Sequence, residues 1–525
     1  MKFKSINELL QYTEEIKGKT FKEIDSENLL ENTTNLMRNK GILGHVVESG
    51  FYKYPINSNP QADFDEIGVE LKVTGYKKSK KGVLSAKERV SLSKIDYHGI
   101  VNEEYDFSKL ISKNKKILFI WYEYEKEKDI GDFLITDYQL YDMGQDEDII
   151  RNDFYLIKQK VCDGLAHELS EGDTSYLGAC TKARTSKDRT SQPYSSIMAK
   201  PRAYSLKNSY MTGILRSIGH DDEIPISPEL EVEGLSALED FLNSDVEKSD
   251  EELRLLEKFI NPDIFNTNEN EFEALKRLIY NEGLKDADVI EGLKSLDEFV
   301  SLKIKDSIHR YKTVEEYVYD KIKDYIGKSQ LDILHELTGK TYEDNIPKNI
   351  NKMITDALIG KDKELPEKDD LFAKTNFIIK NLPLTKRGKA RERMAFRNLR
   401  LSEFEEEWDD SDWKAYFEEV TLLVILWREP DSSCRNGYRV LDGVKKISFD
   451  DDDLRSFEIS YLMVRETILN QDTSLLPTPN SFDGQYLVVA PKGQKGDDAY
   501  NNFFKKDTTK VTFMLTKEFL NEKLA

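Results

Sequence analysis

The chain repeats itself, and this repeat limits what it can fold into. Six short segments recur in the same order in its second half, at offsets between 304 and 321 residues. In the first half the matched segments begin at residues 18, 39, 86, 118, 176 and 206. Ordered matches at a nearly constant spacing indicate a duplicated fold. The 525 residues therefore should build two similar domains and not one large core.

The hydrophobic pattern of each half predicts an α/β domain. Alternating apolar residues predict a strand over 64–76, and the continuous apolar run at 115–122 predicts a buried strand. Helical spacing predicts helices over 149–169 and 208–218. The expected organisation is a first domain over 1–220, an acidic helical connector over 221–306 and a second domain over 307–525, each domain having a mixed central sheet.

The net charge of −21 argues at first against a nucleic-acid partner. However, residues 1–220 contain as many basic as acidic residues, so the remainder of the chain carries the whole excess. Between Lys72 and Lys94 eight basic residues stand against Glu88 alone, and between Lys182 and Arg216 eight stand against Asp188 alone. Such clusters favour contact with phosphate groups.

One motif in the first domain carries the chemistry of phosphodiester hydrolysis. Asp63, Glu70 and Lys72 form the pattern D-x6-E-x-K at the start of the strand predicted over 64–76. Residues two apart on a strand share a face, so Glu70 and Lys72 should point the same way, and Asp63 can fold back to them. Carboxylates hold Mg²⁺, which activates water, while a lysine orients the nucleophile or stabilises developing charge. A solvated strand edge is the alternative interpretation of the motif alone.

The segment from Lys40 to Lys72 resembles the MutH family, which has the pattern KGxxGxxxE followed by D-x6-ELK. Here these positions are Lys40-Gly41, Gly44, Glu48, Asp63 and Glu70-Leu71-Lys72. The resemblance implies two MutH-like, restriction-endonuclease-like domains. It also implies Mg²⁺ held by Asp63, Glu70 and the Leu71 carbonyl, with Lys72 beside the attacking water. Glu48 would be the family's helix-borne acid, and Lys115 a further lysine near the phosphate.

The same resemblance implies a DNA-recognition surface near residues 177–189 and 200–206. The segment from Tyr176 to Lys182 is similar to the family's YLxxxxK run, in which Lys182 would donate to guanine. Cys180 stands where the repair enzyme has an arginine, and Arg184 could substitute for it. The segment 201–207 resembles PRGFYLK. Its residues expected to contact DNA are Arg202, Tyr204, Ser205 and Lys207.

The second copy has lost the acidic residues of the motif. Gly360 stands in the place of Glu48, Leu371 in that of Asp63, and Ile378 in that of Glu70, whereas Lys380 matches Lys72. A domain without these acids should not cut DNA. It keeps a basic run from Lys386 to Arg400, so we expect it to bind DNA. The residues expected to make this contact are Arg391, Arg393 and Lys492.

The function expected is a type II restriction endonuclease that cuts double-stranded DNA at 5′-GATC, before the G, with the second domain binding a further GATC as effector. Two chains should meet on DNA at each palindromic site. The alternatives are a GATC-directed mismatch-repair nicking endonuclease and a GATC-binding protein that does not cut. Three scattered cysteines and the lack of a long apolar segment predict a cytoplasmic protein without a membrane partner.

Overall fold

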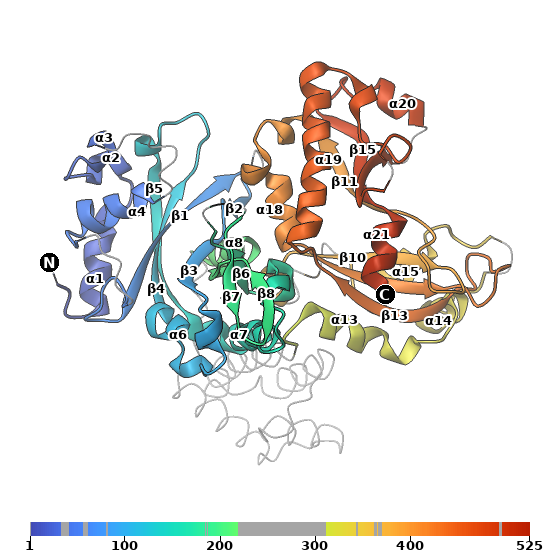
Figure 1. Cartoon of the computed structure of the whole chain (residues 1–525), viewed down its shortest axis with the longest axis horizontal. Helices are drawn as coiled ribbons and strands as arrows, with labels where there is room; N and C mark the ends of the chain where they lie inside the picture. The colour runs from blue at the N-terminus through green and yellow to red at the C-terminus, as the bar shows by residue number, and fades with distance from the viewer. Residues whose placement is uncertain are drawn as a thin grey trace, which may run out of the picture. The chain divides into compact units, whose positions relative to one another are not determined.

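The computed structural model describes residues 2–32, 41–55, 61–79, 82–183, 185, 187–218, 311–342, 345–361, 365, 370–482, 484–492 and 496–525. Met1–Arg216 and Thr313–Ala525 belong to one compact unit. We call the described residues up to 218 the first lobe and those from 311 onward the second lobe (Figure 1). The expected connector over 221–306 lies outside the described residues. Within the described part, no helix is long and apolar enough to cross a membrane.

The first lobe is built on a four-stranded mixed sheet in the order β2-β1-β4-β5. Strand β1 runs parallel to β4, whereas β2 and β5 are antiparallel to their neighbours. A second sheet has the order β3-β9-β6, and β7 pairs with β8. The strands are β1 (Val69–Lys78), β2 (Leu84–Ala86), β3 (Val90–Lys94), β4 (Lys116–Glu123), β5 (Leu134–Asp142), β6 (Leu177–Thr181), β7 (Thr190–Gln192), β8 (Ser195–Ala199) and β9 (Arg202–Leu206).

The N-terminal helices cover one face of the β1–β4–β5 sheet (Figure 1). On central strand β4, Leu118, Ile120 and Tyr122 join the core beneath these helices, whereas Phe119 and Trp121, also buried, alternate with them. The helical elements of the first lobe are α1 (Ile6–Thr13), α2 (Phe21–Ile24), α3 (Leu29–Asn32), α4 (Ile42–His45), the π-helical segment η3 (Val46–Phe51), α5 (Tyr97–Ile100), α6 (Lys109–Asn114), α7 (Glu147–Cys162) and α8 (Asn208–Ser217).

The second lobe repeats two three-stranded arrangements of the first. Its sheet β10-β12-β13 has β10 parallel to β12 and β13 antiparallel, which reproduces β1-β4-β5. Its sheet β11-β15-β14 reproduces β3-β9-β6. The strands are β10 (Phe377–Leu384), β11 (Met394–Arg400), β12 (Thr421–Arg428), β13 (Val440–Ile447), β14 (Leu487–Pro491) and β15 (Thr508–Leu515). The mixed α/β fold class expected from the sequence is confirmed.

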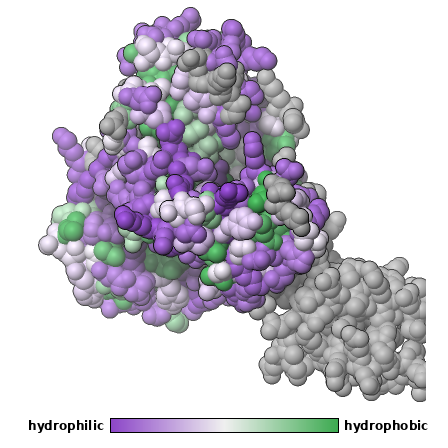
Figure 2. Space-filling view, turned by 90° about the vertical axis from the view of Figure 1, so that its right-hand side faces the viewer, coloured by the Kyte–Doolittle hydropathy of each residue, from purple (hydrophilic) through white to green (hydrophobic). Residues whose placement is uncertain are grey.

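The helices of the second lobe follow the same plan. Helix α18 precedes β12 as α6 precedes β4, and α19 follows β13 as α7 follows β5. The helices are α13 (Val314–Ile322), α14 (Gln330–Thr338), α15 (Ile350–Leu358), α17 (Asp370–Ala373), α18 (Asp412–Glu419), α19 (Asp451–Asn470), α20 (Gly496–Asn501) and α21 (Lys517–Leu524). The face in Figure 2 is mostly hydrophilic, with small and separate apolar areas.

The strand register tests the residue-by-residue match between the two lobes. Glu70 and Ile378 are both the second residue of their strand, and Lys72 and Lys380 are both the fourth. Lys72 lies opposite Phe119, however, and Lys380 lies opposite Val424. The match of Leu118 with Val424 is therefore displaced by one residue, because short apolar runs do not fix a register.

Candidate active site

The N-terminal end of β1 places an acid and a base on one face of the sheet. Glu70 is 1% exposed, and the Lys72 Nζ lies 2.6 Å from the Glu70 Oε1. The two side chains share a face because they are two residues apart on a strand. Pairing of β1 with the buried strand β4 fixes this position, since Glu70 lies opposite Ile117. The expected approach of these two side chains is present in the structure.

A tight turn returns Asp63 to the same place. The backbone N–H of Phe64 donates to the Val69 carbonyl at 2.9 Å, and Gly68 takes the left-handed conformation with φ of 66°. The turn aims the Asp63 carboxylate at β1, where its Oδ2 accepts the Leu71 N–H at 3.0 Å. The six residues that separate Asp63 from Glu70 are those that form this turn.

The second cation at this place is Lys113 and not Lys115. The Lys113 Nζ lies 3.4 Å from the Glu70 Oε1. Its helix α6 begins at Ser108, whose Oγ accepts the Ile111 N–H and caps the first turn. Lys115 follows the end of α6 with its side chain exposed. The structure thus brings Lys113 and not Lys115 to Glu70, because the helical turn before β4 directs these two lysines differently, and the role expected of Lys115 stays a prediction.

Glu48 completes the cluster from the π-helical segment η3. Burial, together with the negative charges of Asp63 and Glu70, raises the pKa of Glu48 to about 7. Burial also raises the pKa of Glu70, and the charge of Lys72 opposes that rise. Isolated π-helical turns occur often at functional sites. A carboxylate with a pKa near neutrality can exchange protons at working pH.

The carboxylates fit a Mg²⁺ ion of the kind held by two acids, a carbonyl and water. The Glu70 Oε2 is buried and accepts no hydrogen bond in the described residues. A buried carboxylate oxygen without a donor is costly, and a cation would satisfy it. Among the described residues no three acidic, His or Cys side chains are grouped closely enough to hold a metal unaided. Mg²⁺ commonly binds to one or two carboxylates and retains water, so this set suffices.

The raised pKa of Glu48 predicts a pH-dependent cost to stability in the absence of metal. An acid whose pKa is higher in the folded than in the unfolded state destabilises the fold once it ionises. That cost is absent near pH 4 and fully present above pH 7. We expect Glu48→Gln in EDTA to raise the free energy of unfolding at pH 8 by about 1–2 kcal/mol, after allowance for partial exposure.

Thermal melting of the full chain at pH 4.5 and pH 8 measures this effect, with the exposed Glu15→Gln as control. The Glu48 variant should melt above the wild type at pH 8 and level with it at pH 4.5. A lower melting temperature of Glu48→Gln at pH 8 would show that the ionised carboxylate stabilises the fold.

Comparison with known proteins agrees with this arrangement. The family profile described as "DNA mismatch repair enzyme MutH" matches residues 52–153, a range that contains Asp63, Glu70, Lys72 and Lys113. Residues 52–153 are thus similar to the MutH family. The resemblance read from the sequence is thereby confirmed.

The curated relatives to which this chain is similar fall into two groups. The "Type II restriction enzyme Sau3AI" of Staphylococcus aureus is 41% identical over 207 residues, which are 38% of this chain and 42% of that enzyme. The "DNA mismatch repair protein MutH" of Vibrio campbellii is 26% identical over 213 residues, 40% of this chain and 92% of that protein. The MutH of Vibrio vulnificus is 26% identical over 215 residues, with the same coverage. The alignment thus spans less than half of the restriction enzyme.

Most of the DNA-recognition residues expected from the sequence are buried. Arg202 is 3% exposed and donates to the Ala179 carbonyl at 2.7 Å. Tyr204 packs on Phe154 of α7 in the core. Ser205 is 0% exposed, and its Oγ donates to the Glu171 Oε1 at 3.3 Å. In this conformation these three side chains are not exposed to solvent, and their contact with DNA stays a prediction.

The remaining recognition residues differ in exposure. Lys207 is buried and donates to the Thr174 carbonyl, so the structure does not present it to DNA. Lys182 is exposed in the loop after β6, with its Nζ 3.4 Å from the Ser91 Oγ. Arg184 lies outside the described residues. Lys182 is therefore the residue of this group that the structure presents to solvent.

In the second lobe the residue in the place of Glu70 is not an acid. Ile378 packs against the hydrophobic core, and Lys380 donates to the Ala395 carbonyl at 2.7 Å. The residues expected to contact DNA, Arg391, Arg393 and Lys492, are all exposed. Arg391 donates its Nε to both Glu429 oxygens at 3.0 Å. Lys492 donates to the Phe396 carbonyl at 2.9 Å.

Sequence reasoning missed two residues that the structure brings to prominence. Lys113 could have been found from the helix signal Ser108-Lys109-Leu110, which places a capped helix before β4. Arg89 lies between two carboxylates, 3.0 Å from the Glu171 Oε1 and 2.7 Å from the Glu418 Oε2. No local signal identifies Arg89, because Glu418 is contributed by the other lobe.

Proposed function

We propose that the protein is a Mg²⁺-dependent type II restriction endonuclease that hydrolyses both strands of DNA at 5′-GATC, before the G. The observation that carries the proposal is the buried Glu70 carboxylate, held 2.6 Å from the Lys72 Nζ and 3.4 Å from the Lys113 Nζ. Asp63 and Glu48 adjoin it. Similarity to a type II restriction enzyme supports the reaction class, and the Tyr176–Lys182 resemblance supports the GATC target.

Each residue of the candidate active site has its own role in the proposed hydrolysis. Asp63, Glu70 and the Leu71 carbonyl would hold Mg²⁺, which lowers the pKa of water and neutralises phosphate charge. Lys72 orients the attacking water through its ammonium group. Lys113 offsets the negative charge that grows on the phosphate in the transition state. Glu48, with a pKa of about 7, accepts a proton near neutral pH.

Restriction is favoured over mismatch-repair nicking by the second lobe. The Vibrio MutH proteins match over 92% of their length with only 40% of this chain, whereas the second lobe repeats the β1-β4-β5 and β3-β9-β6 arrangements of the first. A GATC-binding protein without cleavage is disfavoured by the complete acid and lysine set of the first lobe. Such a protein would have no need of a buried, unpaired Glu70 oxygen.

The second lobe is proposed to bind a further GATC duplex as an effector. Its strand plan supports a shared mode of DNA contact, while Ile378 in the place of Glu70 removes hydrolysis. Arg393 is exposed and available for phosphate. Because each chain has one carboxylate set and GATC is palindromic, two chains are proposed to meet at each cut site. A second bound GATC would raise their effective concentration.

A digest separates these functions. DNA that contains GATC and a matched DNA without it are incubated with the full chain in Mg²⁺ or in EDTA. The proposal expects double-strand breaks only in the GATC-containing DNA with Mg²⁺. Persistent single-strand nicks would favour the repair activity. Binding without any break would favour the non-cutting protein.

A further inference from the structure

Helix α19 of the second lobe carries an apolar stripe on its outer face (Figure 1). Ile459 is 47% exposed, Leu462 is 40% exposed and Leu469 is 72% exposed. The other face of the helix packs on the core of the second lobe through residues such as Phe457 and Val464. Large apolar side chains that lie next to one another on a protein surface are typical of an interaction site.

The exposed positions of α19 have the spacing of a coiled-coil seam. Neighbouring positions are alternately three and four residues apart, which is the a/d spacing of a heptad repeat. At about 1.5 Å per residue, the stripe is about 27 Å long. Before the last residue of the helix, the exposed positions are Asp452, Arg455, Ile459, Leu462, Glu466 and Leu469.

The equivalent helix of the first lobe, α7, does not carry this stripe. In α19 the Ser460 Oγ donates to the Leu487 carbonyl at 2.6 Å, at the start of β14. In α7 the Asp153 carboxylate accepts the Leu177 N–H at 2.9 Å, at the start of β6. These contacts align the two helices. The α7 residues that match Ile459, Leu462, Glu466 and Leu469 are then Asn152, Tyr155, Gln159 and Cys162. The duplicated fold therefore does not require apolar side chains on this face.

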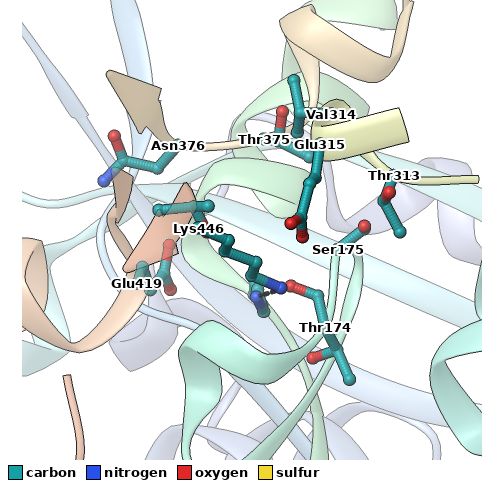
Figure 3. A pocket seen from close by; sticks show the side chains of 11 residues that line it. Thr174, Ser175, Thr313, Val314, Glu315, Thr375, Asn376, Glu419 and Lys446 are labelled. Atoms are coloured by element: carbon teal, nitrogen blue, oxygen red, sulfur yellow. Dashed lines mark hydrogen bonds between the residues drawn. The ribbon is translucent and has the colours of Figure 1, made fainter. Parts of the chain in front are cut away.

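The contact between the two lobes leaves the stripe uncovered. This contact includes the start of α19, where Asp451 lies 2.8 Å from the Lys200 Nζ. It also includes a small pocket in which Thr174 and Ser175 of the first lobe face Lys446 of the second (Figure 3). The three apolar side chains of the stripe keep their exposure with both lobes present. A partner for them must therefore come from outside this chain.

The charges of the stripe are complementary to those of a second α19 that runs in the opposite direction. A two-fold axis through the middle of the stripe places Ile459 of one copy opposite Leu462 of the other. The same axis places Arg455 opposite Glu466. In a parallel pair each of these charged residues would meet its own counterpart, and like charges across a seam disfavour pairing. The stripe is thus self-complementary in the antiparallel direction only.

We propose that α19 is the surface through which two copies of this chain associate on DNA. The proposal rests on the proposed function, in which two chains meet at each cut site, and it names the surface that joins them. An antiparallel pair of identical helices has a two-fold axis, and so has the palindromic GATC sequence. One symmetric complex can therefore contain both the helix pair and the cut site.

The area of the stripe indicates that the helices pair weakly without DNA. A seam about 27 Å long on helices about 10 Å wide buries on the order of 600 Å² over both copies. Stable protein interfaces bury about 1,200–2,000 Å². Asp452 also faces Leu469 at both ends of the seam, so that only the central part is apolar. We therefore expect a monomer in solution and a dimer on DNA, which raises the effective concentration of the two chains.

Reversal of single charges tests the antiparallel pairing. Sedimentation velocity of the full chain with a duplex that contains one GATC, in EDTA, measures how many chains bind to each duplex. Arg455→Glu and Glu466→Arg should each weaken the association of two chains about tenfold, because like charges then meet on both sides of the centre. An equimolar mixture of the two variants should recover the association, because opposite charges meet at both places in the mixed pair.

The apolar part of the seam is tested separately. Leu462→Asp should abolish the association of two chains on the duplex. The matched control is Leu156→Asp on α7, because Leu156 is also 40% exposed. The control should associate as the wild type does. Thermal melting verifies that each variant is folded.

Three results would overturn the proposal. They are a wild type that stays monomeric on the duplex, a mixture of the two charge variants that associates no better than either alone, and equal losses in the two leucine variants. The measurement in EDTA does not depend on cleavage. A wild type that pairs through α19 on the duplex but never cuts GATC in Mg²⁺ would contradict the proposed function, and the assignment of α19 would stand.

Discussion

Replacing Glu70 with glutamine is expected to reduce DNA cleavage by at least about a thousandfold while leaving the affinity for DNA nearly unchanged. The substitution preserves the size of the side chain and removes the charge that would hold Mg²⁺. The activated water and the neutralised phosphate are lost together, and each contributes several kcal/mol to the transition state. Affinity for DNA comes from phosphate and base contacts elsewhere. Asp63→Asn should behave similarly, because an amide oxygen can still accept the Leu71 N–H.

The matched control is Asp65→Asn, an exposed acid two residues from Asp63. It should cut at the rate of the wild type. Single-turnover cleavage and anisotropy binding on the same duplex separate the two effects. Equal losses of cleavage and of binding in the Glu70 variant would show that Glu70 supports the fold or the DNA contact and not the reaction.

Lys113→Met is expected to slow cleavage by about ten- to a hundredfold, whereas Lys115→Met should have little effect. Lys113 lies 3.4 Å from the Glu70 Oε1, and its ammonium can offset charge on the phosphate. Lys115 is exposed beyond the end of α6. The two variants remove the same charge from positions two residues apart, so nonspecific attraction to DNA changes equally in both.

Cleavage rates at saturating enzyme make this comparison independent of affinity. Lys72→Met, measured alongside, should show the larger loss because Lys72 lies closer to Glu70, at 2.6 Å. A larger effect of Lys115→Met than of Lys113→Met would restore the assignment based on resemblance. It would also mean that α6 turns when DNA binds.

The fold and the acid cluster follow from local features of the sequence. The apolar run at 115–122 predicted β4 to within one residue. The alternating pattern over 64–76 predicted β1, which begins at Val69 and not at residue 64. The late start has a physical reason, because residues 64–68 form the turn that carries Asp63 back to the strand. Strand periodicity could place Glu70 and Lys72 on one face without any knowledge of the rest of the molecule.

The burial of the recognition surface depends on contacts between residues far apart in the chain, which the local sequence pattern does not predict. Alternation along β9 places Tyr204 on the face opposite Ser205, and the structure packs that tyrosine on Phe154 of α7. Arg202 and Arg89 are engaged by Asp451 and Glu418, which are more than two hundred residues away in the chain. Such ion pairs are set by how the lobes pack, and a single sequence does not reveal them.

The position of the cut tests the central claim most directly. A duplex with one GATC is labelled at the 5′ end of each strand, incubated with the full chain and Mg²⁺, and its products are mapped to single-nucleotide resolution. The account predicts one cut in each strand immediately before the G of GATC, which leaves four-base 5′ overhangs, and no product in EDTA. Cuts at other sequences, or products that form equally in EDTA, would contradict it.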